Sequence, residues 1–496
     1  MKASIIRRIV MMLLPLTFSS VAIAQEDFQK IFDDFQKANE KEFADFRDKA
    51  NAQYVEFLKQ GWEWFTGKAP MPKPVHEEPV VPPVVLPDED RDKELDDKEI
   101  PYEEVLPEPE PSPVPGPIAP IEEVPVPVSK YVTFSMYGTE FSVRYDPDTK
   151  PFIRTVSVNP LSEFWEELYM SDGVDNLIYD CLLLRKGIAM CDWAFYRFTE
   201  ALGHALYPYS QDEAAMFQAY VLTQSGFRLR LGYSKDDEHY HFITATDCDM
   251  YEYSFWELET GNYYLLDGSE ISHLGIINED FPESVPMCMA ITQEILLAEN
   301  LTEGRLLTSE QYKEASATVS TNLNLLSFYD DYPATFVNED TRTRWRFYAN
   351  VPLGRTVRES LYPQLEQAIA GKTEYQAADL LLNFVQTAFE YGYDEEIWGT
   401  DRTFFADESI YYPYCDCEDR SVLYSRLVRD IMGLDVVLIY YPGHLATAVK
   451  FTQPVNGDYI TYDGDRYTIC DPTYINAPVG MTMPDMDNAT AFILPL

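Results

Sequence analysis

A proline-rich acidic stretch at residues 69–128 divides this chain and limits what each part can fold into. It holds 17 of the 34 prolines in the 496 residues, mixed mainly with Glu, Asp and Val. Proline removes a backbone donor, and this composition offers too little apolar surface to build a core. We therefore expect 69–128 to be a disordered, extended linker between an N-terminal segment and a large folded body.

The first residues have the pattern of an export signal. Lys2, Arg7 and Arg8 give a basic start, residues 9–16 are apolar, and a small-x-small site ends at Ala24. The apolar run is too short to span a bilayer. We expect a signal peptide over residues 1–24, cleavage near Ala24, a periplasmic or secreted protein, and no stable membrane insertion.

The charge and the cysteine count narrow the function classes. There are 83 acidic and 38 basic residues, a formal net charge of -45. Such a surface repels phosphates, which argues against binding to nucleic acid. The seven cysteines are too few for a disulfide-held scaffold, and in an oxidising compartment the odd number leaves one thiol unpaired.

Residues 25–68 read as an amphipathic helical segment. Phe28, Phe32 and Phe35 recur at helical spacing, with charged residues between them. Two interpretations remain open: a helix that binds a partner, or a helix that folds back on the main body.

The folded body alternates between helical and strand patterns. The patterns predict a hairpin over 131–145 with its turn at Gly138, helices over 160–226, strands over 227–271, a β-rich stretch over 285–355 that includes 318–328 and 345–351, helices from 357, and a final helix followed by strands.

A cysteine marks the predicted start of the last helix. Asp416 suits the N-cap position, with Asp419 three residues on, and Gly433 suits the C-terminal stop. Cys417 then becomes the first helical residue. The positive end of the helix dipole favours a thiolate there, so we expect a low pKa for this thiol.

The two strand regions after this helix supply a base and an acid. His444 opens the first of them and is the only histidine after His273, while Asp471 ends a strand over 467–470. Taken singly, such residues are most often structural. Their order after Cys417, at gaps of 27 and 27 residues, instead favours a nucleophile, a base and a carboxylate that orients the base.

This pattern resembles the transglutaminase-like superfamily of cysteine enzymes over about residues 375–480. The matching motifs are Cys417-Glu418-Asp419, Gly433, His444-Leu445-Ala446-Thr447 and Asp471-Pro472-Thr473. The resemblance implies Cys417 as nucleophile, His444 as base, Asp471 as orienting carboxylate, and a peptide or protein substrate. Cys415 is a competing nucleophile that does not fit Cys-x-Asp. The family commonly has an aromatic where Ala446 stands, which leaves hydrolysis and acyl transfer both open.

An altered copy of the same layout precedes it. Ser210, His241 and Asp267 follow the same helix, strand and strand order, with gaps of 31 and 26 residues. Ser210 and Glu213 match a capping box, and serine is a weak nucleophile without an exceptional base. We expect this copy to be a degenerate, non-catalytic module.

Together these observations predict an α+β protein with two transglutaminase-like (papain-like) units. The expected boundaries are a signal peptide at 1–24, a helical segment at 25–68, a linker at 69–128, a degenerate unit at 129–284, a β-rich connection at 285–355 and a catalytic unit at 356–496.

The function that follows is thiol-dependent hydrolysis or acyl transfer at amide bonds, as in a peptidase or amidase. The alternative is an exported scaffold or ligand-binding protein that keeps the fold without turnover. No cofactor is expected, and no metal, because the cysteines and histidines lack paired ligand spacing.

Overall fold

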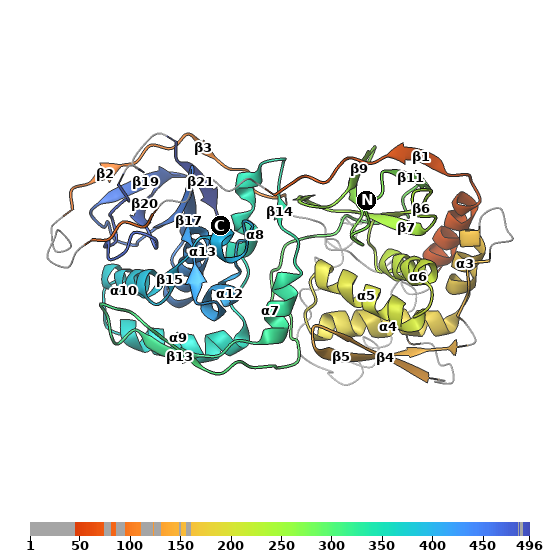
Figure 1. Cartoon of the computed structure of the whole chain (residues 1–496), viewed down its shortest axis with the longest axis horizontal. Coiled ribbons are helices and arrows are strands. Elements are labelled where there is room, and N and C mark those ends of the chain that lie inside the picture. Colours follow the sequence, from red (N-terminus) through yellow and green to blue (C-terminus); the bar gives the residue numbers. More distant parts are fainter. Residues whose placement is uncertain are drawn as a thin grey trace, which may run out of the picture.

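The computed structural model describes residues 45–73, 81–85, 95–110, 123, 130–147, 150–154, 160–484, 486 and 490–496 (Figure 1). The expected export signal, and the phenylalanines at 28, 32 and 35, lie outside these residues. Within the described part of the chain, no helix is both long and apolar enough to cross a membrane.

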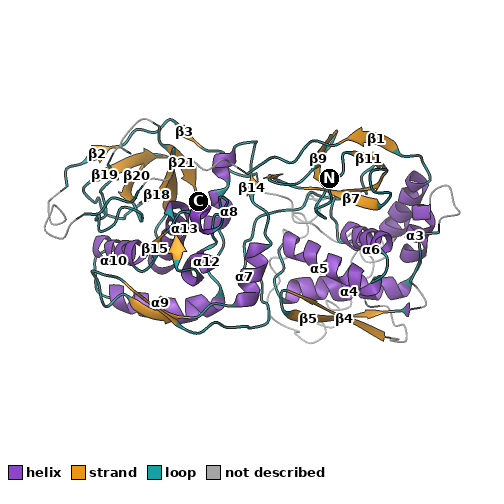
Figure 2. Ribbon diagram, viewed as in Figure 1, coloured by secondary structure: helices purple, strands orange, loops and turns teal. Residues whose placement is uncertain are grey.

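The protein is a mixed α+β structure of two lobes that lie side by side (Figures 1 and 2). In each lobe a curled sheet lies along one edge, helices fill the middle, and a two-stranded hairpin lies along the opposite edge. We call residues 130–291 the first lobe and residues 305–496 the second lobe.

The first lobe contains a hairpin, four helices and a sheet. In chain order these are β4 (Lys130–Met136), β5 (Thr139–Tyr145), α3 (Pro160–Tyr169), α4 (Asp172–Gly187), α5 (Asp192–Leu206), α6 (Gln211–Gln224), β6 (Leu229–Ser234), β7 (Tyr240–Ala245), β8 (Asp249–Met250), β9 (Phe255–Leu258), β10 (Gly261–Tyr264) and β11 (His273–Ile276). The hairpin turns at Tyr137 and Gly138, both with positive φ, which confirms the predicted turn.

The second lobe repeats this plan with more helices. Its elements are β12 (Arg305–Thr308), β13 (Ser316–Val319), α7 (Leu323–Asp330), β14 (Thr335–Phe336), η2 (Thr341–Thr343), α8 (Trp345–Ala349), α9 (Arg355–Ile369), α10 (Glu374–Thr387), β15 (Glu390–Tyr391), α11 (Asp394–Ile397), α12 (Ala406–Tyr411), β16 (Tyr414–Cys415), α13 (Cys417–Leu427), η3 (Val428–Met432), β17 (Val436–Tyr441), β18 (His444–Val449), β19 (Asp458–Tyr462), β20 (Asp465–Cys470) and β21 (Phe492–Pro495).

The main sheets of the two lobes have the same strand order. The first runs β9-β10-β7-β6-β11-β1, with β1 at Glu63–Thr66. The second runs β19-β20-β18-β17-β21-β3, with β3 at Glu104–Val105 and β2 (Lys98–Glu99) added beyond β19. In each lobe one helix, α6 or α13, packs on the central hairpin. The elements that the sequence aligned therefore correspond in the two lobes: the hairpins β6-β7 and β17-β18 and the strands β10 and β20 have the same positions in their sheets, and α6 and α13 pack on the hairpins.

The N-terminal region is integrated into both lobes. Residues 45–58 form a helix whose Tyr54 is buried, with its ring centroid 5.0 Å from that of Trp165. The described part of this segment therefore folds back on the body. The notion of a disordered linker does not fit the described residues 98–99 and 104–105, which pair with the second sheet as β2 and β3.

Two runs expected as strands are mainly helical. Residues 318–328 contain α7, whose cap residue Asn322 accepts a hydrogen bond from the Asn324 backbone N–H. Residues 345–351 contain α8, which follows a turn capped by Asp340. Asn322 thus caps α7 directly, whereas Asp340 caps the η2 turn that leads into α8. The β-rich description of 285–355 was therefore wrong for these two runs.

Candidate active site

The start of helix α13 is built as the sequence predicted. The backbone N–H of Asp419 donates to the carboxylate of Asp416, and the backbone N–H of Asp416 donates back to Asp419 over 3.2 Å, which confirms the capping box. The helical run ends at Gly433, which has a left-handed φ of 67°. Cys417 is the first residue of α13, so the capping box fixes the backbone position from which its side chain extends.

His444 and Asp471 meet where strand β18 begins and strand β20 ends. His444 Nε2 lies 2.8 Å from Asp471 Oδ2. Both side chains are buried, and the Nδ1 atom of His444 has no hydrogen-bond partner among the described residues. The aspartate itself is held by the backbone N–H of Thr473, which donates to its Oδ1 over 2.9 Å. The imidazole is thus anchored through one nitrogen only.

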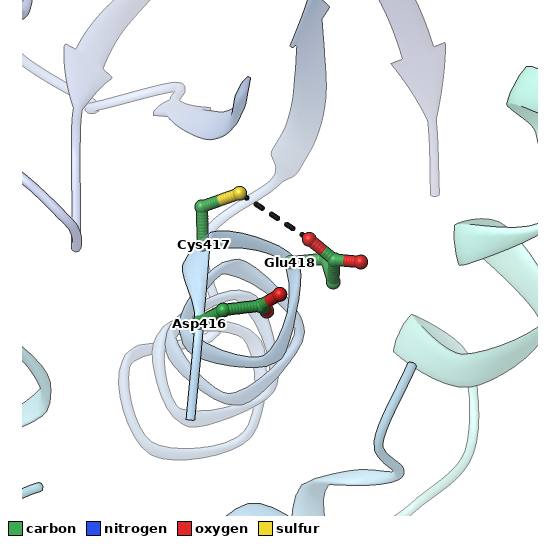
Figure 3. Close-up of side chains that lie close together, drawn as sticks. All are labelled: Asp416, Cys417 and Glu418. Atoms are coloured by element: carbon green, nitrogen blue, oxygen red, sulfur yellow. Dashed lines mark hydrogen bonds between the residues drawn. The ribbon is translucent and has the colours of Figure 1, made fainter. Parts of the chain in front are cut away.

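Cys417 lies against the beginning of the same strand. The backbone N–H of Leu445, the residue after His444, points to Cys417 Sγ. One turn along α13, Ser421 donates to the Leu445 carbonyl over 2.8 Å and ties the helix to β18. The thiol itself contacts Glu418, with 3.2 Å between Sγ and Oε2 (Figure 3). Helix and strand therefore bring the predicted nucleophile to the strand end that carries the predicted base.

The electrostatics at Cys417 differ from the sequence expectation. Burial, then the carboxylates of Glu418 and Asp416, raise the pKa of this thiol well above its usual range. Only 8% of Cys417 is exposed, so water does not screen those charges. The low thiol pKa expected from the helix N-terminus was wrong, because desolvation and two neighbouring acids outweigh the helix dipole. The raised pKa favours the protonated thiol at neutral pH.

Cys415, the competing nucleophile, is engaged elsewhere. It lies on β16, and the Arg420 guanidinium donates to its Sγ from Nε over 3.4 Å. Arg420 is buried and also donates to the carbonyls of Gln386 and Phe389. Burial raises the pKa of Cys415, against the opposing effect of Arg420. Its sulfur thus serves as an acceptor for a structural arginine.

A group of carboxylates next to Cys417 was not predicted. Oxygens of Asp394, Asp401 and Glu418 lie within 4.8 Å of one another, which is close enough to share a cation. Burial and the charge of Glu418 raise the pKa of Asp394 to about 8. The three residues come from separate segments, so no sequence spacing marks them. Glu418 lies inside the Cys-x-Asp motif but was given no role.

The first lobe contains a matching histidine with different partners. His241, on β7, lies 2.8 Å from Asp267 through Nδ1 and 2.9 Å from Asp237 through Nε2. Burial alone would lower the pKa of His241, but the two carboxylates outweigh it and raise that pKa. Both ring nitrogens are therefore occupied, and the imidazole has no position left from which to act as a base.

Ser210 does not cap helix α6 through its side chain. Its backbone is at the N-cap position, but the side chain makes no cap hydrogen bond. Its hydroxyl donates instead to the carboxylate of Glu213, which also accepts the Ile153 backbone N–H over 3.1 Å. The predicted capping box was wrong because the carboxylate is a stronger acceptor and holds the hydroxyl.

Comparisons with known proteins found no family model that matches this chain and no curated protein with significant similarity to it.

Proposed function

We propose that the second lobe carries out thiol-dependent acyl chemistry on an amide bond of a peptide or protein. Cys417 is the nucleophile, His444 the base and Asp471 the residue that orients the base. The proposal includes a transglutaminase-like architecture for both lobes, with the first lobe non-catalytic, and export directed by residues 1–24.

One observation carries the proposal. His444 is held by Asp471 through Nε2, while its buried Nδ1 has no partner among the described residues. A buried ring nitrogen without a partner costs stability, and this one is open to accept a proton. The next residue, Leu445, contacts Cys417 Sγ through its backbone N–H. In the proposed mechanism this nitrogen receives the thiol proton.

The reaction follows from these positions. The Cys417 proton passes to His444 Nδ1 as sulfur attacks the carbonyl carbon. The C–N bond breaks, and the imidazolium protonates the departing amine. Water then attacks the thioester, gives its proton to His444 and releases a carboxylic acid, after which the proton returns to sulfur. Asp471 stabilises the imidazolium in both halves. An amine in place of water gives transfer.

The resting thiol must leave Glu418 before it can react. The Cys417 Sγ–H is directed at Glu418, at 3.2 Å, rather than at an open nitrogen. Rotation of the cysteine side chain exchanges one partner for the other, with the backbone unchanged. Substrate binding that neutralises the nearby acids favours the exchange, because the charges of Glu418 and Asp416 raise the pKa of the thiol.

A second candidate is a binding protein without turnover. Cys417 is 8% exposed, and His444 and Asp471 are each 2% exposed. The raised thiol pKa fits an inert cysteine equally well. The two candidates differ in whether Cys417 can react with an electrophile that mimics a carbonyl substrate.

Labelling with a peptidyl acyloxymethyl ketone tests the proposal. The wild-type protein should form one covalent adduct, located at Cys417 by peptide mass spectrometry. His444→Ala should slow adduct formation by at least about 100-fold, because general-base catalysis is worth about that much or more. Cys415→Ser serves as the matched control and should label at the wild-type rate. An adduct at Cys415, or equal labelling in His444→Ala, would falsify the mechanism.

A further inference from the structure

A cleft of about 390 Å³ lies between the two lobes, and its lining includes Asp401, a near neighbour of Glu418. It is lined from the first lobe by Tyr251, Glu252 and Tyr253, and from the second by α7, the turn after it, and residues 400–403. β8 and β14 pair next to lining residues Tyr251 and Ala334, Met250 with Thr335, and connect one lobe to the other. Its volume is typical of ligand-binding clefts.

The cleft reaches Cys417 through two carboxylates. Asp401 lines the cleft, and its carboxylate lies within 4.8 Å of that of Glu418. Glu418 in turn lies 3.2 Å from Cys417 Sγ. Arg344 also lines the cleft and pairs with Asp401 at 3.6 Å. Asp401 and Glu418 thus form a short chain of side chains between the cleft lining and the sulfur.

The lining combines tyrosines with an excess of acid. Five tyrosines line the cleft: Tyr251, Tyr253, Tyr329, Tyr332 and Tyr348. Five carboxylates face three basic side chains there, and Arg402 is shared by two of those acids, Asp330 and Glu408. Aromatic faces and carboxylates together attract amino and guanidino groups.

The acids at the rim are the accessible ones. The side chain of Glu252 is 61% exposed and that of Asp330 is 65% exposed. They come from opposite lobes, so a ligand that spans the cleft can meet both. Deeper in, burial raises the pKa of Glu408 to about 7, partly offset by Arg402. Specificity for charge should therefore come mainly from the rim.

We propose that this cleft binds the substrate of Cys417, and that the substrate is a peptide segment with basic side chains. The inference rests on the proposed function for the chemistry, and on the cleft geometry for the substrate class. It also gives the first lobe a role in substrate binding, because Glu252 and the two adjacent tyrosines supply one wall of the cleft.

Two matched affinity labels test this in the full-length protein. One is a tripeptide chloromethyl ketone with two lysines, and the other carries two glutamates in their place; each alkylates sulfur with loss of chloride. The lysine reagent should label Cys417 about five- to tenfold faster, the range expected for two exposed charge contacts. The Glu252→Gln/Asp330→Asn double variant should bring the ratio close to one.

The control variant is Glu359→Gln/Glu366→Gln on α9, which changes net charge equally at exposed positions away from the cleft. It should keep the wild-type ratio. Labelling by iodoacetamide, which is small and uncharged, should be the same in the wild type and in this control variant. A ratio near one in the wild type, or a ratio unchanged in the double variant, overturns the proposal.

Binding separates this inference from the proposed chemistry. The lysine tripeptide amide, which is not reactive, should bind Cys417→Ala protein more tightly than the glutamate amide does, as measured by calorimetry. Binding with that preference but no labelling of Cys417 would refute the proposed thiol chemistry and support the cleft as a binding site for basic peptides. Labelling of Cys417 without any binding preference would refute the proposed specificity of the cleft and support the thiol chemistry.

Discussion

His241 and His444 lie near the start of corresponding strands, β7 and β18, yet they use their ring nitrogens differently. His241 bonds Asp267 through Nδ1 and Asp237 through Nε2. His444 bonds Asp471 through Nε2, and its Nδ1 has no hydrogen-bond partner in the described part of the chain. One extra carboxylate thus distinguishes a histidine that is fully held from one that can accept a proton.

His444 and Asp471 should not contribute equally to the rate of turnover. His444→Ala removes the proposed base, whereas Asp471→Ala leaves it present but less well oriented. We expect the larger loss in His444→Ala, with single-partner losses of up to about 10⁴-fold in turnover. Adduct formation rates for both variants check the order, and circular dichroism checks that both remain folded. A greater loss from Asp471→Ala would contradict the assigned roles.

Replacing Glu418 should make Cys417 more reactive. Its carboxylate lies 3.2 Å from Sγ and helps to raise the thiol pKa. Glu418→Gln keeps a hydrogen-bonding group but removes the charge, so the pKa should fall and iodoacetamide labelling at pH 8 should speed up. The pH profile of labelling should shift to lower pH. Glu418→Asp retains the charge and should shift it less; identical profiles for Gln and Asp would contradict this account.

The first lobe should gain stability from His241 mainly at mildly acidic pH. The folded-state pKa of His241 is raised, and those of Asp237 and Asp267 are lowered. A raised histidine pKa stabilises the fold fully below the unfolded value of about 6.5, and the gain is lost as pH rises through the folded pKa. The carboxylate contribution is present above the unfolded aspartate pKa and is lost as pH falls through the folded one.

The Tm difference between wild type and His241→Gln should therefore be larger at pH 5.5 than at pH 9. His273→Gln provides a control, since that side chain is 61% exposed. Thermal unfolding at the two pH values measures both differences. A Tm difference that does not change with pH would mean that His241, Asp237 and Asp267 do not titrate as a unit.

The local features that the sequence predicted well have short-range causes. The capping box at Asp416, the stop at Gly433 and the strand led by His444 depend on residues a few positions apart. Capping and left-handed backbone preferences act at that range, so one sequence contains them. The pairing of His444 with Asp471 followed from the order of strands in a hairpin arrangement.

The features that were missed depend on tertiary contacts. Asp394 and Asp401 reach Glu418 only after the chain folds, and burial rather than residue type sets the thiol pKa. The failure at Ser210 had the same origin, because Glu213 is oriented by Ile153, far away in sequence. Helices α7 and α8 were missed because β-forming aromatics outweighed the cap residues in the pattern.

Substitution of Ser210 should affect stability but not chemistry. Its hydroxyl donates a hydrogen bond to Glu213 at the start of α6, in the lobe where both ring nitrogens of His241 are occupied. Ser210→Ala should lower the free energy of unfolding by about 0.5–1.5 kcal/mol, as for one lost hydrogen bond. Urea unfolding measures this, and Cys417 labelling should stay at the wild-type rate. Lost labelling in a folded Ser210→Ala protein would assign an active role to the first lobe.

The segment at 95–106 should prove to be part of the second lobe. Ile100 is 1% exposed and packs in a cluster with Val437, Ile439 and Ile493, while its backbone N–H donates to Tyr459 over 2.7 Å. Ile100→Ala removes buried methyl groups and leaves a cavity, so it should destabilise that lobe by about 2–5 kcal/mol.

Val81 lies in the same proline-rich segment but is 74% exposed, so Val81→Ala should change stability by less than about 0.5 kcal/mol. Urea unfolding of both variants measures the difference. Ile100→Ala should also speed proteolytic cleavage near residue 100, because release of β2 exposes backbone that is paired with Asp458 and Tyr459. Equal stability of the two variants would mean that this segment does not pack on the sheet, and that the linker predicted from composition describes it better than the strand pairing does.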